Sequence, residues 1–408
     1  MRPIRLTLLT DGLPPYVMGG MQTHSLNMAK SLAKSGVQVD VYHVVPDGDS
    51  DAELQRNNLI THRFAPPQRQ WYPGHYIAEQ NNLSADFLSH YAKQPPADII
   101  YAKGLTASAF LKAQASDKIS LPPVITNIHG YESFQPAATF MEHFRGALLR
   151  PAFRYVIEKS DYVVSYGGKV TDLLTSKLGV PAGRVLEISG AVDDICLRTQ
   201  HPTARKSSES SSRRFAFVGR YERRKGLQEL AAALHGIDIA NHEFHLIGPI
   251  PDSILNRFPT FVQKHGPVSD RNRLIALLDN MDIVVCPSWS EGMPNVIMEA
   301  MARQCSIIAT DVGAVRCLVD DTTGWLILPR DSRALKTSIS SAMDIDHNRL
   351  AAMKSAARNR VTAEYSWSSI TRSTIDCLRH VLNESINSRR RNHTHSCDIR
   401  PNGLPKSA

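Results

Sequence analysis

Short apolar segments alternate with helical segments along most of this 408-residue chain, and glycine or polar residues follow the apolar ones. The first unit shows the pattern. Residues 4–10 are apolar, a loop with Gly19 and Gly20 follows, residues 23–35 repeat apolar side chains at helical spacing, and residues 37–45 read as the next strand. A strand–loop–helix–strand unit of this length is a βαβ crossover between parallel strands. Its repetition predicts an α/β protein with doubly wound parallel sheets.

A polar, serine-rich segment divides the pattern into two series, and the length is too great for one ordinary core. We expect an N-terminal Rossmann-like domain over residues 1–200, a linker over 201–213, and a C-terminal Rossmann-like domain over 214–366. A last helix over 367–384 is expected to cross back to the first domain. Residues 385–408 are polar, basic and broken by proline and glycine, and are predicted to be disordered. In such sheets, ligands bind at the carboxyl ends of the strands.

The net charge of +8 lies mainly outside the predicted domains. Residues 203–214 carry +3 and residues 385–408 carry +4, so the folded body is close to neutral. It has no basic face interleaved with aromatic side chains. A nucleic-acid partner is therefore not expected.

The sequence also indicates where the protein works. It has no run of eighteen apolar residues, and the short apolar N-terminus is followed by Asp11 where a signal peptide would need small residues. The six cysteines form no C-x-x-C pair, which indicates reduced thiols and no metal site. We expect a cytoplasmic protein.

One segment suggests contact with a membrane. Residues 140–155 mix phenylalanines and leucines with three arginines, and a basic amphipathic helix can lie on anionic lipid. The alternative is an ordinary helix pair packed on the first domain. We therefore keep two expectations open, peripheral contact with the inner membrane surface and a purely cytoplasmic location.

The stretch from Cys286 to Arg303 reads as strand, loop and helix, with Glu291 in the loop and Glu299 in the helix. If the loop folds back, both carboxylates line one crevice, where each can accept two hydrogen bonds from a vicinal diol. The helix, which opens near Pro294, offers free N–H groups suited to phosphate. The alternative is a solvated loop glutamate and an ordinary helical one.

Two cations follow a strand in the second half. Arg220 and Lys225 lie in GRYERRKG, directly after the apolar FAFVG. Fixed cations stabilise the growing negative charge of a departing diphosphate. The alternative is a solvated basic loop, since Arg223 and Arg224 are also present.

Two features of the first half complete this pattern. Gly19 and Gly20 have no side chains, so their backbone can approach a phosphate or a sugar closely, although the pair can equally be a plain turn. His129 ends the apolar VITNI and can hydrogen-bond a sugar hydroxyl, although a lone histidine at a strand end can also be structural.

A D-x-D motif offers a competing reading. Asp47, Asp49 and Asp51 resemble the metal-binding motif of one large class of glycosyltransferases. They lie in a very polar loop, so we expect a solvated surface loop and no metal.

Taken together, the motifs resemble those of glycosyltransferase family 4, the retaining enzymes of the GT-B fold. The resemblance extends over roughly residues 4–370 and rests on the joint order of GGMQTHSLNMAKSLAKSG, VITNIHG, DYVVS, FVGRYERRKG, HLIGP, HGPVS, CPSWSEGMPNVIMEAMA and ATDVGAVRCLVDDTTGWLI. It implies two Rossmann-like domains that face each other across a cleft.

The resemblance also implies roles for residues. His129 would lie near the transferred sugar, Arg220 and Lys225 would hold the diphosphate, and Glu291 would bind the sugar. The remaining substrate-binding residues would be Gly19, Gly20, Gly219, Met293, Pro294, Asn295 and Glu299. The donor would be a UDP- or GDP-sugar, with no cofactor and no metal.

Retention is thought to proceed on one face of the sugar, with the leaving phosphate taking the acceptor proton. No nucleophilic carboxylate is obvious in the first half; Glu132, the nearest candidate, is outside the family pattern.

The expected function is therefore transfer of a sugar from a nucleotide-diphospho-sugar to a glycan or lipid-linked acceptor, in surface polysaccharide or cell-envelope synthesis. A sugar-nucleotide epimerase of the same fold is the first alternative, and it would need acid/base carboxylates in both halves. A catalytically inactive sugar-nucleotide-binding protein is the second. The presence of Glu291, Glu299, Arg220 and Lys225 argues against it.

Overall fold

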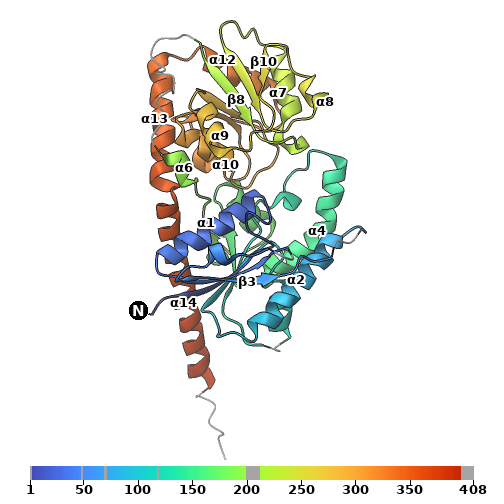
Figure 1. Ribbon diagram of the computed structural model, residues 1–408, viewed down its shortest axis with the longest axis vertical. Coiled ribbons are helices and arrows are strands. Elements are labelled where there is room, and N and C mark those ends of the chain that lie inside the picture. The colour runs from blue at the N-terminus through green and yellow to red at the C-terminus, as the bar shows by residue number, and fades with distance from the viewer. Residues whose placement is uncertain (1, 47–48, 69–70, 117–118, 199–211, 397–408) are drawn as a thin grey trace, which may run out of the picture.

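Two parallel sheets, one in each half of the chain, organise the structure, a computed structural model (Figure 1). It describes residues 2–46, 49–68, 71–116, 119–198 and 212–396. The predicted linker at 201–213 lies almost wholly outside the described residues. The two sheets fall on either side of it.

The N-terminal sheet has seven strands in the order β3-β2-β1-β4-β5-β6-β7, and every neighbouring pair is parallel. Its strands are β1 (Arg5–Leu9), β2 (Gln38–Val44), β3 (Leu59–Phe64), β4 (Ile99–Lys103), β5 (Val124–Asn127), β6 (Tyr162–Ser165) and β7 (Val185–Glu187). Its helices are α1 (Gly20–Lys34), α2 (His75–Tyr91), α3 (Ser108–Ala115), α4 (Phe140–Lys159) and α5 (Lys169–Asp172), and the short α6 (Asp194–Leu197) that follows β7 packs against the C-terminal unit. The strand order reverses direction between β1 and β4, the point where open α/β sheets bind ligands.

The C-terminal sheet has six parallel strands in the order β10-β9-β8-β11-β12-β13. They are β8 (Arg214–Val218), β9 (Glu243–Ile247), β10 (Val262–Lys264), β11 (Ile283–Cys286), β12 (Ser306–Thr310) and β13 (Gly324–Ile327). The helices are α7 (Leu227–Leu234), α8 (Asp252–Leu255), α9 (Arg271–Leu278), α10 (Asn295–Ala302), α11 (Val315–Leu318), α12 (Ser332–Met343) and α13 (His347–Glu364). Both sheets therefore have the doubly wound α/β architecture predicted from the sequence.

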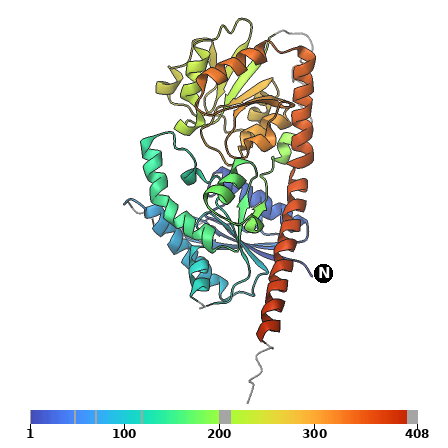
Figure 2. The ribbon, with the colours of Figure 1, turned by 180° about the vertical axis from the view of Figure 1, so that it is seen from behind.

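A long last helix, α14 (Trp367–Ser396), runs from the C-terminal unit along the N-terminal one (Figures 1 and 2). It packs against α1, and Leu378 and Val381 are buried in the N-terminal core. The prediction of disorder from residue 385 onward is wrong for residues 385–396, which are helical. The physical reason is that no proline or glycine interrupts the chain between Trp367 and Pro401, so nothing stops the helix. The rest of the predicted tail, residues 397–408, lies outside the described residues.

Two further elements need comment. The region between residues 46 and 95 contains the helix α2 and an edge strand, β3, whose LITHRF sequence alternates buried and exposed side chains. A proline inside a helix usually breaks or kinks it, yet α4 continues through Pro151. None of the helices in the described part of the chain combines the length and the hydropathy of a bilayer-spanning segment.

Candidate active site

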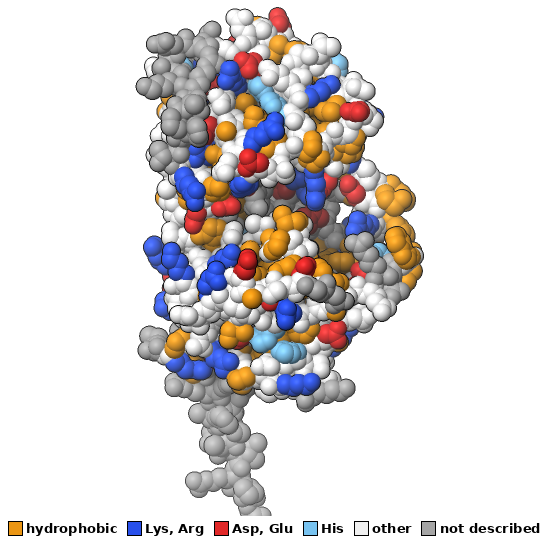
Figure 3. Space-filling view, in the orientation of Figure 1, with side chains coloured by type: hydrophobic (Ala, Val, Ile, Leu, Met, Phe, Trp, Pro, Cys, Tyr) orange, Lys and Arg blue, Asp and Glu red, His pale blue; other side chains and the backbone are white. Residues whose placement is uncertain are grey.

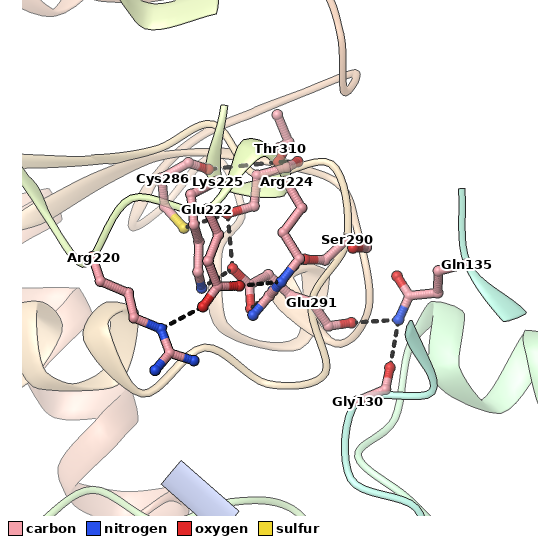
Figure 4. A network of polar contacts seen from close by, with 11 residues as sticks. Gly130, Gln135, Arg220, Glu222, Arg224, Lys225, Cys286, Ser290, Glu291 and Thr310 are labelled. Carbon is pink, nitrogen blue, oxygen red and sulfur yellow. Dashed lines mark hydrogen bonds and ion pairs between the residues drawn. The ribbon is translucent and has the colours of Figure 1, made fainter. Parts of the chain in front are cut away.

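The loop between β11 and α10 holds Glu291 beneath the surface of the C-terminal unit (Figure 4). Its side chain is buried, with one carboxylate oxygen 2.6 Å from the Lys225 ammonium. The hydroxyl of Ser288 donates to the same oxygen over 2.7 Å, and the other oxygen lies 3.5 Å from the Arg224 guanidinium. The loop glutamate is thus fixed by two cations and a hydroxyl instead of being solvated.

The two cations come from the turn after β8, a short 3-10 helix over Arg223–Lys225. Gly226 follows with a positive φ of +73°, and a Cβ on it would lie 1.9 Å from the carbonyl oxygen of Pro287. Only glycine permits this close approach, which brings the cationic turn onto the Glu291 loop. Arg224 also pairs with Glu222 at 2.7 Å, and Arg220, which is largely exposed, contacts Glu222 as well.

Opposing effects set the ionisation of Glu291. Burial by itself raises the pKa of its carboxyl, but Lys225 and Arg224 outweigh burial and hold the pKa below its ordinary value. The Ser288 hydrogen bond acts in the same direction. Glu291 is therefore a carboxylate at neutral pH, able to accept hydrogen bonds from sugar hydroxyls.

His129 faces this loop from the end of β5. Its φ of +71° is unusual for a residue with a side chain, and its backbone N–H donates to the Asn127 side chain over 2.7 Å. Tyr166 accepts from the Asn127 amide, so its hydroxyl is free to donate to Nδ1 of His129. On this hydrogen-bond assignment the proton of His129 is on Nε2. Burial, together with the charge of Lys103, lowers the pKa of His129 to about 3, so the ring is neutral.

The two units touch directly beside Glu291. The amide of Gln135 donates to the backbone oxygens of Gly130, at 2.6 Å, and of Glu291, at 2.7 Å (Figure 4). A Cβ on Gly292 would lie 2.9 Å from the Cα of Gly130. The backbone of one unit thus packs against the backbone of the other across the site.

Of the cavities between the units, two bear on the predicted site, and the space-filling view shows the surface hollowed there (Figure 3). The larger, of about 840 Å³, is lined by Gln22, Glu132 and Arg145 from the N-terminal unit and by Arg220, Arg224 and Ser290 from the other. The smaller, of about 400 Å³, is lined by Gly19, Gly20, His24, Asn295, Glu299 and Trp367 among others. The first is rich in charge, and the second is bordered by the starts of α1 and α10.

Glu299 lies in the smaller cavity but is already engaged. Its carboxylate is 2.7 Å from the guanidinium of Arg271, which is itself 3.9 Å from Asp193. A ribose bound there would therefore meet a carboxylate whose position is set by Arg271. Within the described residues, neither α1 nor α10 has a side-chain cap or an acidic residue in its first turn, so the N–H groups at both starts are open to an anion.

The structure brings most of the predicted site residues together. Glu291, Lys225 and His129 meet at the contact between the units, and Arg220 lies at the edge of the larger cavity. Gly19, Gly20, Asn295 and Glu299 share the smaller cavity. Met293 is buried with its sulfur 3.2 Å from the nitrogen of Gly190. Pro294 is at the N-cap position of α10. Gly219 directly follows β8, with its carbonyl against Gly248. These positions leave the individual roles as predictions.

Sequence reasoning missed several contributors. Arg224 contacts Glu291. From the sequence, Arg224 supports only the alternative interpretation of this turn as a solvated basic loop. Glu132, which the sequence offered only as the nearest carboxylate outside the family pattern, lines the larger cavity, where removal from bulk water raises the pKa of its carboxyl and Arg224 opposes this. The Gln135 amide donates to the carbonyl oxygen of Glu291, which is 156 positions away, so no local pattern signals that contact.

The D-x-D segment has a structural use at one position. The expectation of a solvated loop is wrong for Asp51, which is buried and lies 3.1 Å from His43 and 3.5 Å from Arg63. Asp47 lies outside the described residues.

Comparison with known proteins agrees with this geometry. The family model described as Glycosyltransferase Family 4 matches residues 18–194, and the model Glycosyl transferases group 1 matches residues 212–344. Glycogen synthase of Mycobacterium tuberculosis is 22% identical over 405 residues, covering 91% of this chain and 93% of that protein. The putative teichuronic acid biosynthesis glycosyltransferase TuaC of Bacillus subtilis is 25% identical over 289 residues, covering 68% and 69%.

A solved structure shares the whole fold. HepE of Anabaena, crystallised with UDP and glucose, superposes with a TM-score of 0.68 at 18% identity, covering 92% of this chain and 100% of that one. At this identity the likeness establishes the fold, and the two family models, which together match well over half of the sequence, establish the family. The chain belongs to glycosyltransferase family 4 and has the GT-B fold, with two Rossmann-like domains facing across a cleft.

Proposed function

We propose that this glycosyltransferase moves a sugar, with retention of configuration, from a UDP- or GDP-sugar to a glycan or lipid-linked acceptor in surface polysaccharide synthesis. The observation that carries the proposal is the position of Glu291, a buried carboxylate held by Lys225 and Arg224 at the contact between the domains. The nucleotide-sugar class is supported by the UDP and glucose bound to HepE, and the product class by the named role of TuaC.

In this proposal the donor spans both cavities. The ribose lies against Glu299 in the smaller cavity, and the diphosphate lies between the open starts of α1 and α10. The sugar lies against Glu291 and the backbone of Met293, Pro294 and Asn295. The acceptor enters through the larger cavity, where Glu132 and Arg145 meet it.

The leaving diphosphate gains negative charge as the sugar departs, and in this proposal that charge is stabilised by Lys225, Arg224 and Arg220, which lie beside Glu291 and the larger cavity. The neutral His129 donates a hydrogen bond from Nε2 to the sugar. The leaving phosphate oxygen takes the proton of the acceptor hydroxyl as the new bond forms on the same face. Because these residues supply the positive charge, we propose that transfer requires no metal ion.

The test is transfer with a panel of UDP- and GDP-sugars, with the product anomer read by NMR and the reaction repeated in EDTA. We expect one donor to be used, with retention, at the same rate in EDTA. An inverted product would contradict the retaining mechanism, and loss of activity in EDTA that added metal restores would contradict metal independence. Conversion of a sugar nucleotide incubated alone would instead favour an epimerase.

We further propose that the protein works in the cytoplasm with α4 against a membrane surface. Phe140, Met141 and Phe144 are 83%, 72% and 56% exposed, and apolar side chains gather on the lobe that α4 forms (Figure 3). Of the nearby arginines, Arg154 is exposed, whereas Arg150 bonds the backbone of Ser133 over 2.7 Å. An aromatic face of this kind inserts into the headgroup region of a bilayer.

Co-sedimentation with phosphatidylglycerol vesicles at low salt tests this location. We expect binding that Phe140→Ser/Phe144→Ser abolishes and that Leu328→Ser, a matched change at an exposed apolar residue of the other domain, leaves intact. Absence of wild-type binding would contradict it.

A further inference from the structure

Lys103 ends β4, at the point where the N-terminal sheet reverses its strand order, and its side chain is completely buried. Among the described residues it forms no ion pair with a carboxylate. Its contacts are Nδ1 of His24, 3.3 Å from the ammonium, and the ring of Tyr101, 5.1 Å away. A buried cation is normally paired, so this one lacks its expected counter-ion within the described chain.

The lysine contact determines what His24 can do. A charged ammonium group donates hydrogen bonds and accepts none, so when Lys103 is protonated, Nδ1 of His24 accepts and the ring proton is on Nε2. Nε2 of His24 is buried and has no hydrogen-bond partner in the part of the chain that the structure describes. The same is true of Nε1 of Trp367, whose ring centre lies 5.4 Å from that of His24.

Both unpaired N–H groups belong to residues that line the smaller cavity and are only 7% exposed. Leaving a buried donor unpaired is costly, and such groups in native structures call for a partner. The same cavity has the open N-terminus of α1 at Gly20 and the amide of Asn295. Its free groups are therefore mainly hydrogen-bond donors, which suits a ligand that presents several anionic oxygens.

We propose that the Nε2–H of His24 and the Nε1–H of Trp367 are a pair of hydrogen-bond donors for the diphosphate of the nucleotide-sugar, and that Lys103 holds His24 in its donating form. The proposal rests on the proposed donor class. In this proposal the diphosphate of the substrate is the counter-ion of Lys103. It also assigns a binding role to Trp367, the first residue of the crossing helix α14.

The ionisation of the surrounding groups supports this assignment. Burial lowers the pKa of Lys103 to about 7, and a nearby anion favours the charged form. The titratable groups facing it are His24 from α1, His129 after β5 and Tyr101 on its own strand. Burial lowers the pKa of both histidines and raises that of the tyrosine, so all three stay neutral near pH 8. Binding of a diphosphate near pH 8 should therefore take up a proton at Lys103.

Calorimetry with UDP, GDP and ADP first selects the nucleotide, and the matching nucleoside then serves as the probe without phosphate. His24→Phe and Trp367→Phe each remove an N–H and keep a ring. We expect each to weaken binding of the nucleoside diphosphate about tenfold and to leave nucleoside binding unchanged. His24→Gln keeps a donor and should restore most of the affinity. Trp289→Phe is the matched control, because its indole nitrogen is also buried and unpaired among the described residues but lines a different cavity.

Titrations near pH 8 in two buffers of different ionisation enthalpy provide a second readout. Wild type should take up a proton on binding, and Lys103→Met should not. Thermal melts show which variants are folded. If His24→Phe does not fold, the binding of the nucleoside diphosphate to Trp367→Phe tests the proposal alone. The proposal is overturned if folded His24→Phe and Trp367→Phe bind the nucleoside diphosphate with wild-type affinity. That result is expected if the two N–H groups meet only water in the cavity. Equal weakening for nucleoside and diphosphate, or failure of His24→Gln to restore binding, would also overturn it. If wild type binds none of the three nucleotides, the proposed function falls with it.

Discussion

The ammonium of Lys225 lies 2.6 Å from a carboxylate oxygen of Glu291, and this pair joins the turn after β8 to the loop after β11. Both partners are largely removed from water. The pair therefore serves two purposes in our account. It fixes the carboxylate that meets the sugar, and it keeps a cation beside the leaving diphosphate.

Breaking this pair from one side should cost stability. Lys225→Met leaves the buried carboxylate with Arg224 and Ser288 alone, and we expect a loss of about 3 kcal/mol in the free energy of unfolding. Because Lys225 helps to keep the pKa of Glu291 low, its contribution is present above the ordinary pKa of a glutamate and fades as pH falls through the folded pKa. Urea unfolding at neutral pH and near pH 4 measures both effects.

The double variant Lys225→Met/Glu291→Gln supplies the control. It removes the uncompensated charge, so it should recover much of the lost stability. If the double variant loses as much free energy of unfolding as the Lys225→Met and Glu291→Gln variants lose in sum, the two residues are not coupled.

Removal of the Glu299 charge should weaken donor binding without altering the chemical step. Glu299→Gln keeps the shape of the side chain but removes the charge that we propose accepts hydrogen bonds from the ribose hydroxyls. We expect affinity for both the nucleoside and its diphosphate to fall about tenfold. Asp320→Asn breaks another carboxylate–guanidinium pair of the same 2.7 Å length, with Arg360, and should leave binding unchanged. Unaltered affinity in Glu299→Gln would remove Glu299 from the ribose site.

The close contact between the domains should not tolerate one methyl group. A Cβ on Gly292 would lie 2.9 Å from the Cα of Gly130 and 3.1 Å from the carbonyl oxygen of His129, and both are backbone atoms that cannot rotate away. Gly292→Ala should therefore push the domains apart and lower transfer at least tenfold, since small displacements of reacting groups are costly. Gly183→Ala, where no atom of the described residues lies within 4 Å of the added carbon, should behave as wild type. Normal kinetics in Gly292→Ala would contradict the packing described here.

The fold and much of the site were predictable because their signals are local. A buried strand followed by glycine, a polar loop and a helix can be read within about thirty residues, and that pattern indicated the doubly wound halves and the loop position of Glu291. The edge strand β3 gave a weaker signal, because LITHRF mixes His and Arg with its apolar residues, as edge strands do. The helical end of α14 was missed because its polar composition outweighed its lack of helix breakers.

Contacts between distant segments could not be predicted in the same way. Lys103 and His24 are 79 positions apart, and Gln135 and Glu291 are 156 apart. The segment GRYERRKG has four basic residues. The way the turn after β8 packs on Pro287 determines which of them contact Glu291, and the spacing of the residues in the segment does not reveal this packing. The sequence indicated a cationic turn, and the structure distinguishes Lys225 and Arg224 from the exposed Arg220.

The buried lysine should make stability depend on pH in an unusual direction. Burial lowers the pKa of Lys103 to about 7, so the unfolded chain binds more protons than the folded one between about pH 7 and pH 10. The cost of burying the charge is full below pH 7 and disappears toward pH 10. Lys103→Met should therefore be more stable than wild type at about pH 6.5, by a few kcal/mol, and the advantage should shrink as pH rises.

Urea unfolding of both proteins at several pH values measures this difference. Lys112→Met, which removes a lysine of the helix α3, controls for the general effect of losing a positive charge. A stability difference that does not vary with pH would show that Lys103 does not titrate in this range.

The most direct test of the central claim is sugar transfer by Glu291→Gln, measured with the donor that wild type selects from a panel of nucleotide sugars. The substitution keeps the size of the side chain and removes the charge that Lys225 and Arg224 hold in place. Our account predicts that the folded variant loses at least a hundredfold in transfer, a loss that corresponds to about 2.7 kcal/mol of transition-state stabilisation. Near-normal transfer by Glu291→Gln would contradict it.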